Sequence, residues 1–417
     1  MPGPNSLALA SRLSRTESPD TTFISADFPV FWQSAHGSIV TDVDGNLYLD
    51  AASSFGAVSI GHSHPEVVAA IRSQAETLIH GMGDVHPSRV KVELLERLVS
   101  LAPAPDSLVI LGISGADAVE AALKTAFRVT AKPGVIAFDS GYHGLTYGAL
   151  EPTARGHFRD PFRPQRGQFT THLPFGCPID IVHDCLVSSP MPIGAIIAEP
   201  VQGRGGIRIP PGGWLAELQA LCLEHGALLI LDEIYTGWGR TGKLFACAWD
   251  GVAPDLLCVG KAMGGGMPIS AMIGRRDVME RAWPRSKGEA MHTSTFLGHP
   301  LACASALAAI SVIVREDLAQ RSFVLGELLR SSLKSLVEEF PDRLVEARGR
   351  GLMIGLECRS AGIAKSCMVQ CLKRGLIVLL AGDDGSVIEL TPPLTISQLQ
   401  LEWCINCLRT VVCSLKV

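Results

Sequence analysis

Short runs of apolar residues, each ending in small or polar residues, recur over the first three hundred positions of the chain. Helical patterns, in which apolar residues recur every three or four positions, separate several of them, as at 116–130 and 213–225. Short apolar strands that alternate with amphipathic helices predict an α/β fold, with a mostly parallel sheet covered by helices on both faces. The predicted strands lie at 107–115, 134–144, 193–200, 227–233, 255–261 and 270–275.

The pattern changes after residue 300, where long helical stretches dominate. Helices are predicted at 301–314, 320–340 and 397–415, and strands at 351–358 and 376–382. Near the other end, residues 37–50 predict a hairpin with Asp44-Gly45 as its turn. We therefore expect an N-terminal arm and hairpin (1–50) that packs with a smaller α+β domain (301–417), and a large domain between them (51–300).

Composition limits the classes of protein to which the chain can belong. Of 417 residues, 47% are hydrophobic and 18% are charged, which predicts a large buried core. A net charge of −5 without a long basic run argues against nucleic acid as a partner. No apolar run approaches the roughly 18 residues of a membrane span. Twelve cysteines without a secretory signal predict reduced thiols in a cytoplasmic enzyme, and residues 1–20 predict a short disordered or partner-contacting arm rather than a transit peptide.

Two polar residues at the ends of predicted strands are candidates for chemistry, because open α/β sheets bind ligands beyond the carboxyl ends of their strands. Lys261 follows an apolar run and precedes three glycines at 264–266. Burial there would lower the pKa of its amine and favour the nucleophile needed for a Schiff base, although a surface lysine is the alternative. Asp232 ends the most apolar run, where a carboxylate can hold a ring nitrogen protonated or simply cap a turn.

A third strand end, Ser114-Gly115-Ala116, opens a predicted helix. Free backbone N–H groups at a helix start favour a phosphate, but the same residues also make an ordinary strand-to-helix turn. The segment lacks the glycine spacing of a Walker loop or a dinucleotide fingerprint, which weakens nucleotide-binding alternatives. His62 and His64 resemble a metal pair, yet no further ligands follow at suitable spacing, so we predict no metal.

Taken in order, these residues and their surroundings resemble the class III aminotransferases, the fold-type-I pyridoxal-phosphate family that includes the ornithine, acetylornithine and 4-aminobutyrate enzymes. The resemblance covers about 37–393. Its most specific motifs are SGADAVEAALK, YHG (142–144), EPVQGRGG (199–206), LDEIYTGWGRTGKLFA (231–246) and VGKAMGGGMP (259–268). It implies a pyridoxal 5'-phosphate cofactor and a homodimer with shared active sites.

The resemblance also implies roles for residues around the cofactor. Lys261 carries the cofactor as a Schiff base and moves a proton, while Asp232 pairs with the pyridine nitrogen. Tyr142, followed by His143, stacks on one face of the ring, and Ile234 packs on the other.

Further contacts come from other matched segments. Ser114, Gly115 and Ala116 hold the phosphate, Gln202 reaches the ring hydroxyl, and Thr295 contacts the phosphate of the neighbouring subunit. Phe55, Glu199 and Trp238 lie in segments that line the substrate side in the family.

Three positions depart from the family pattern. Leu145 and Glu389 stand where the family has arginines that bind substrate carboxylates, and Arg204 stands where it has a glutamate. We hypothesise that Arg204 and Glu389 pair across the pocket mouth with reversed signs. The sequence therefore predicts an aminotransferase that moves an amino group between an amine or amino acid and an oxo acid, but not a standard 4-aminobutyrate:2-oxoglutarate enzyme. The alternatives are an amino-acid racemase or epimerase with the same cofactor, and a non-catalytic protein that keeps the fold.

Overall fold

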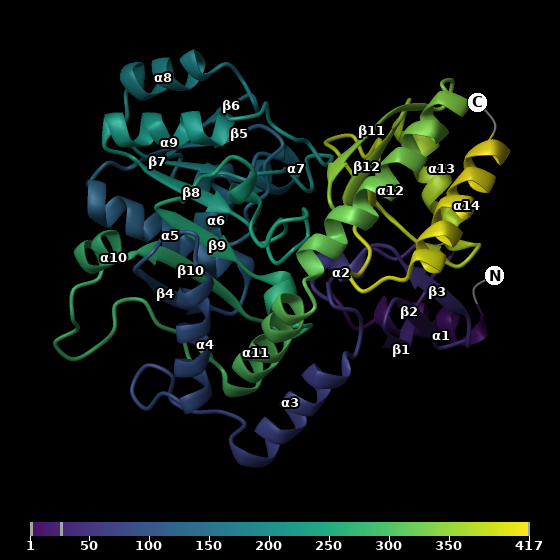
Figure 1. Ribbon diagram of the computed structural model, residues 1–417, viewed down its shortest axis with the longest axis horizontal. Helices are drawn as coiled ribbons and strands as arrows, with labels where there is room; N and C mark the ends of the chain where they lie inside the picture. Colours follow the sequence, from purple (N-terminus) through teal and green to yellow (C-terminus); the bar gives the residue numbers. More distant parts are fainter. Residues whose placement is uncertain (1–2, 26–27, 416–417) are drawn as a thin grey trace.

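A seven-stranded sheet forms the centre of the larger part of the molecule (Figure 1). The structure is a computed structural model that describes residues 3–25 and 28–415. The strand order is β4-β10-β9-β8-β7-β5-β6. These strands are β4 (Ser107–Gly112), β5 (Gly134–Phe138), β6 (Thr170–Leu173), β7 (Ile193–Ala198), β8 (Leu228–Asp232), β9 (Leu256–Val259) and β10 (Ser270–Arg275).

The direction of the strands confirms the predicted, mostly parallel sheet. Strands β6, β5, β7, β8 and β9 pair in parallel, whereas β10 is antiparallel to both of its neighbours. All six predicted strands are present. The sequence missed β6, because its residues Thr170–Leu173 are too polar to stand out and lie at the edge of the sheet.

Helices bury both faces of this sheet, which explains why the inner strands are continuously apolar. On β7, Ala195 and Ile197 pack in one hydrophobic cluster, and Ile196 and Ala198 pack in the other. Successive side chains of a strand point to opposite faces, so these clusters mark the two faces. One face is covered by α5 (Gly115–Thr130) and α10 (Arg276–Ala282), and the other by α4 (Arg89–Leu101), α8 (Ile179–Ser188), α9 (Trp214–His225) and α11 (Pro300–Arg315).

Two smaller sheets lie beside the large one. The first has the order β11-β12-β15-β14, and the second has the order β1-β2-β3-β13. Their strands are β11 (Leu344–Arg350), β12 (Met353–Cys358), β14 (Leu379–Ala381), β15 (Val387–Leu390), β1 (Trp32–His36), β2 (Ile39–Asp42), β3 (Leu47–Asp50) and β13 (Leu376–Ile377). The predicted hairpin is confirmed as β2 and β3, with Gly45 in the left-handed region at its turn.

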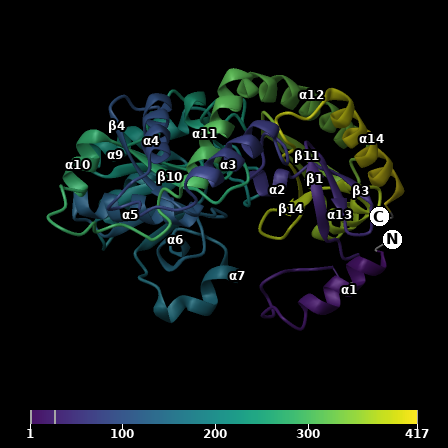
Figure 2. The ribbon, with the colours of Figure 1, turned by 90° about the horizontal axis from the view of Figure 1, so that it is seen from below.

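The predicted single strand at 376–382 is wrong in one respect, because it divides between the two small sheets. β13 pairs in parallel with β3, and β14 pairs antiparallel with β15. The N-terminal hairpin therefore shares a sheet with a C-terminal strand, and Figure 2 shows β1 and β3 beside α13 and β14.

The other helices complete the coverage. They are α1 (Pro4–Leu13), α2 (Ser53–Gly56), α3 (Pro65–Thr77), α6 (Tyr147–Leu150), α7 (Gly156–Arg159), α12 (Leu318–Glu339), α13 (Ala361–Leu372) and α14 (Gln398–Ser414), with the 3-10 turns η1 (Asp160–Gln165), η2 (Ala246–Trp249) and η3 (Lys261–Gly264). The N-terminal arm is not wholly irregular: the backbone N–H groups of Asn5 and Ser6 in α1 donate to the Asp44 carboxylate at 2.8 and 2.9 Å. Within residues 3–25 and 28–415, no helix is both long and apolar enough to cross a membrane.

Candidate active site

A cavity of about 490 Å³ opens at the carboxyl edge of the large sheet. That volume lies within the usual range of small-molecule sites. Eleven of the predicted site residues line it: Ser114, Gly115, Ala116, Tyr142, His143, Leu145, Glu199, Arg204, Asp232, Ile234 and Lys261. Residues that are up to 147 positions apart along the chain thus meet at one edge because their strands all end there.

Asp232, the last residue of β8, is buried and makes a hydrogen-bonded pair with His143. One carboxylate oxygen lies 2.8 Å from His143 Nδ1, and the other accepts the backbone N–H of Ile234 at 3.1 Å. Burial lowers the pKa of His143, but the hydrogen bond and the charge of Asp232 outweigh it, so the pKa is raised above its usual value. The contact with His143 and the hydrogen bond from Ile234 hold the Asp232 carboxylate in one orientation at the end of β8.

Lys261 follows β9 and has a strained backbone, with a φ of 44° that side-chain-bearing residues rarely adopt. Its Nζ lies 3.6 Å from the centre of the Tyr235 ring. Burial lowers the pKa of Lys261 to about 8, although the carboxylates of Glu389 and Asp232 act in the opposite direction. A buried amine that readily loses its proton is the form that attacks a carbonyl carbon.

The start of α5 presents backbone donors to the cavity. Ser114 and Asp117 form a reciprocal capping box, in which each side chain accepts a backbone N–H of the other residue. The N–H groups of Gly115 and Ala116 have no backbone acceptor among the described residues. A Cβ at Gly115 would lie 2.9 Å from Ile234 Cδ1, so only glycine leaves room for a group held here. Backbone N–H groups that lack an acceptor at the start of a helix, beside a residue without a side chain, fit a phosphate.

Glu199 connects the segment that follows β5 with the segment that follows β7. Its carboxylate accepts the backbone N–H groups of Tyr142 and Gly203, both at 3.0 Å. Burial raises the pKa of Glu199 to about 7, although the charge of His143 and the two backbone hydrogen bonds act against it. The guanidinium of Arg204, which lines the cavity, lies 6.0 Å from the centre of the Tyr142 ring.

The hypothesis that Arg204 and Glu389 pair is wrong. No ion pair joins them among the residues that the structure describes. Glu389, on β15, instead accepts the hydroxyl of Tyr235, which also contacts Thr391 Oγ1 at 3.0 Å. Burial raises the pKa of Glu389, although the hydrogen bond from Tyr235 and the charges of Lys261 and Arg204 act in the opposite direction.

Three lining residues were not predicted from the sequence, namely Gly144, Thr146 and Tyr235, and of these Tyr235 makes the contacts that matter most for Lys261. Its ring lies in a slot where a Cβ at Gly56 or Gly203 would approach it to 2.5 or 2.4 Å. From there it contacts both Lys261 and Glu389. A signal was present, because Tyr235 follows Asp232 by three positions in the most specific motif, but a tyrosine there has no role in the resemblance.

Five predicted residues do not line the cavity. Trp238 is fully buried against Phe245, with ring centres 5.2 Å apart, so its assignment to the substrate side is wrong. Gln202 is buried and donates to the carbonyl of Asp139 at 2.7 Å, while its Oε1 has no partner. Phe55 and Thr295 are exposed outside the cavity, and Glu389 lies behind Tyr235.

Together, the residues present fit a phosphorylated heteroaromatic aldehyde. The start of α5 offers donors to a phosphate, Asp232 offers a carboxylate to a ring N–H, and Lys261 offers an amine to the aldehyde.

Comparison with known proteins agrees with this chemistry. Residues 24–412 match the family described as "Aminotransferase class-III". The acetylornithine aminotransferase of Methanopyrus kandleri is 40% identical over 375 residues, which cover 90% of this chain and 92% of that protein.

Two solved structures show the same fold over nearly the whole chain. The ornithine aminotransferase of Toxoplasma gondii superposes with a TM-score of 0.90 at 29% identity, covering 98% of this chain and 95% of that one. A PLP-bound amine transaminase from an uncultivated Pseudomonas species superposes with a TM-score of 0.86 at 28% identity, covering 95% and 98%. These relatives are transaminases, and nothing among them supports the racemase or epimerase alternative. The chain belongs to the class III aminotransferases of fold type I, which transfer amino groups with pyridoxal phosphate as their cofactor.

Proposed function

We propose that this aminotransferase acts on amines, amino acids and oxo acids that bring no more than one carboxylate into the cavity. The observation that carries the proposal is the charge of the lining. Apart from Lys261, the cavity among the described residues has one cationic side chain, that of Arg204. Leu145 is apolar, and Glu389 is bonded to Tyr235.

The name of the archaeal relative suggests one substrate that satisfies this limit. Acetylornithine carries a free terminal amine, a single carboxylate and a neutral acetylated nitrogen. One arginine can receive its carboxylate by a charge-assisted pair, and the apolar side of Leu145 suits the uncharged acetyl group. Glutamate and 2-oxoglutarate carry two carboxylates, of which the second has no cationic partner here.

The roles of the cofactor residues follow from their positions. The bound cofactor supplies an aldehyde that accepts the amino group and a ring that withdraws electrons from the substrate carbon. Lys261 would hold the aldehyde group through its amine, and the same amine would take up and return the proton of the substrate carbon. Asp232 holds the proton of the ring nitrogen, and His143 fixes Asp232 through the 2.8 Å contact.

The remaining lining residues position the ring and its phosphate. Tyr142 and Ile234 hold its two faces, which suits an aromatic side chain against a heteroaromatic ring. Ser114, Gly115 and Ala116 bind the phosphate through the start of α5. Gln202 contacts the ring hydroxyl, and Glu199, which lines the cavity, borders the substrate.

We also propose a homodimer in the cytoplasm, with the division into residues 1–50, 51–300 and 301–417 given above. Thr295 is exposed and lies outside the cavity of its own chain, which supports a contact to the phosphate of a partner. The loop around it carries exposed apolar residues and contacts a second such loop, because Thr293 bonds Asp84 at 3.0 Å. The exposed apolar side chains of the two loops are Leu78, Ile79, Met82, Val85, Met291 and Phe296. An exposed apolar patch of this kind supports a protein interface.

The cytoplasmic location is supported by the cysteines, because twelve free thiols fit a reducing compartment.

Replacing Arg204 with alanine should lower kcat/KM for substrates that bear a carboxylate by about 10- to 100-fold, the loss expected for a hydrogen bond to a charged group. Simple amines should be spared. Arg208→Ala is the matched control, because Arg208 is exposed in the same segment and does not line the cavity. A panel of amines and amino acids against pyruvate and 2-oxoglutarate measures the effect. Efficient use of 2-oxoglutarate by the native enzyme, unchanged in Arg204→Ala, would refute the proposal.

Mixing two inactive protomers should restore activity if the active sites are shared. A Lys261→Ala chain and a Thr295→Ala chain can form a mixed dimer with one competent site, which takes Lys261 from one chain and Thr295 from the other. Activity should rise after the two are unfolded and refolded together, but not when each is refolded alone. An active monomer in sedimentation would end the idea of a shared site.

A further inference from the structure

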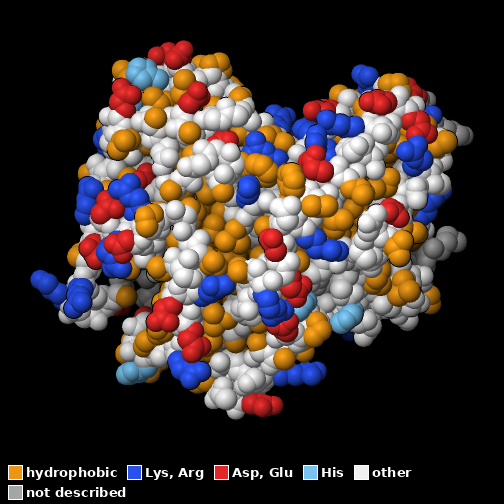
Figure 3. Space-filling model, viewed as in Figure 1, with side chains coloured by type: hydrophobic (Ala, Val, Ile, Leu, Met, Phe, Trp, Pro, Cys, Tyr) orange, Lys and Arg blue, Asp and Glu red, His pale blue; other side chains and the backbone are white. Residues whose placement is uncertain are grey.

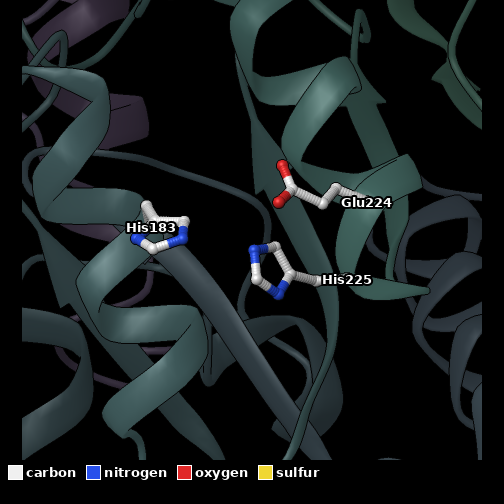
Figure 4. A group of neighbouring side chains, drawn as sticks. All are labelled: His183, Glu224 and His225. Carbon is white, nitrogen blue, oxygen red and sulfur yellow. The ribbon is translucent and has the colours of Figure 1, made fainter.

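Two histidines and a glutamate meet on the outer surface of the large part of the molecule. His183 lies on α8, and Glu224 and His225 lie in the last turn of α9. One ligand atom from each of the three side chains lies within 4.8 Å of the other two. Figure 4 shows the two imidazoles facing each other with the carboxylate beside them. In Figure 3, pale-blue histidine atoms flanked by red carboxylates occupy the same corner, over α8 and α9 of Figure 1.

Packing and hydrogen bonds fix the backbone on both sides of this cluster. Val182 of α8 and Cys222 of α9, adjacent to it, are buried in the same core. Lys132 Nζ donates to the carbonyls of His225 and Gly226 at 2.7 and 3.2 Å, which caps the end of α9. The backbones that carry the two imidazoles are therefore held in place before any ligand arrives.

The cluster also contains an unsatisfied polar atom. His225 Nε2 is buried and has no hydrogen-bond partner in the described structure. The rings of His183 and His225 lie 5.2 Å apart at an angle of 65°. Asp184 adds a second carboxylate, 3.7 Å from His183 Nδ1. Two imidazoles with adjacent carboxylates are a donor set that binds transition-metal ions.

The donor types select the ion. Imidazole nitrogen with carboxylate oxygen suits zinc and its neighbours in the first transition row, whereas calcium and magnesium prefer oxygen alone. Zinc bonds of about 2.0–2.2 Å in a tetrahedron place ligand atoms about 3.3–3.6 Å apart. Ligand atoms within 4.8 Å reach that spacing by side-chain rotation alone.

We propose that His183, Glu224 and His225 bind a zinc ion that ties α8 to α9. The site is structural and separate from transamination, because it lies at the amino end of β8, whereas Asp232 ends that strand. The strand alone separates them by about 13 Å. The proposed zinc site differs from the sequence-based expectation of no metal, which was drawn from His62 and His64. In the structure, His62 bonds Asp50 at 2.8 Å.

Calorimetric titration of the untagged, chelator-treated holoenzyme with zinc chloride tests the site. The native protein should bind one more equivalent than His183→Ala or His225→Ala, and Glu224→Gln should weaken that step at least about tenfold. His36→Ala is the matched control, since His36 is an exposed histidine on β1 and should leave the titration unchanged. Comparing variants removes the contribution of other ligands such as the exposed Cys413.

A second readout is thermal stability, because an ion that binds only the folded state raises Tm. Zinc should raise the Tm of the native protein and of His36→Ala, but not that of His183→Ala. Transaminase activity should be equal in all of them, so failure of the zinc site leaves the proposed function untouched. Equal zinc titrations of the native protein and His183→Ala, or a Kd weaker than about 1 mM for the native protein, would overturn the proposal.

Discussion

Replacing Asp232 with asparagine should leave the cofactor bound but lower kcat by at least about a hundredfold. The carboxylate is buried at the end of β8, where His143 and the N–H of Ile234 hold it in one orientation. A neutral amide of the same shape can still accept the N–H of Ile234 but no longer stabilises a proton on the ring nitrogen. Without that proton the ring withdraws electrons poorly, so loss of the substrate proton slows.

Asp139→Asn provides the control for this prediction. Asp139 also follows a strand of the sheet, at the end of β5, but its side chain is exposed. It should retain near-native kcat. Single-turnover measurements with the native enzyme and the two variants separate proton abstraction from cofactor binding. Near-native turnover in Asp232→Asn would mean that Asp232 is not the partner of the ring.

Replacing Lys261 with alanine should cost still more, with kcat reduced by about a thousandfold or more. The change removes both the amine that holds the cofactor and the group that moves the proton, and general acid–base catalysis alone is worth about 10² to 10⁴ in rate. Lys124→Ala is the control, because Lys124 is an exposed lysine on α5. It should retain near-native kcat and the yellow colour of the bound cofactor. Residual activity in Lys261→Ala near that of the control would exclude Lys261 from the reaction.

The environment of Lys261 adds a pH dependence to the same prediction. Burial lowers the pKa of Lys261 to about 8, so the attacking free base increases as pH rises through 8 and is nearly complete above pH 9. Cofactor uptake by the cofactor-free protein should accelerate over that range and then level off. A rate that falls with rising pH would show that the free amine does not control uptake.

The fold was largely predictable because its strands are buried on both faces. Continuous apolar runs such as Leu228–Asp232 leave few alternatives to a covered parallel strand. The errors fall where that signal is absent. The edge strand Thr170–Leu173 is polar, and the run at 376–382 is apolar throughout but bends between two sheets, which periodicity does not report.

Most of the residues that line the cavity were predictable for a different reason. Asp232 and Lys261 end apolar strands, and the resemblance assigned the rest by position. Position along the chain does not give the partner of a side chain, however. Arg204 and Glu389 were paired by motif offset, but the structure places Tyr235 against Glu389 and Arg204 in the lining of the cavity without an ion pair to it. The assignment of Trp238 to the substrate side was wrong for the same reason, because a tryptophan in a site motif can also pack in the core.

The attachment of the cofactor to Lys261 is the central claim, and borohydride reduction tests it most directly. Reduction of the yellow protein should fix the cofactor covalently, and peptide mapping should find the whole label on Lys261. The buried amine with its pKa of about 8 and its place between the start of α5 and Asp232 predict that result. A label on Lys124, Lys243 or any other lysine, with Lys261 unmodified, would contradict the account.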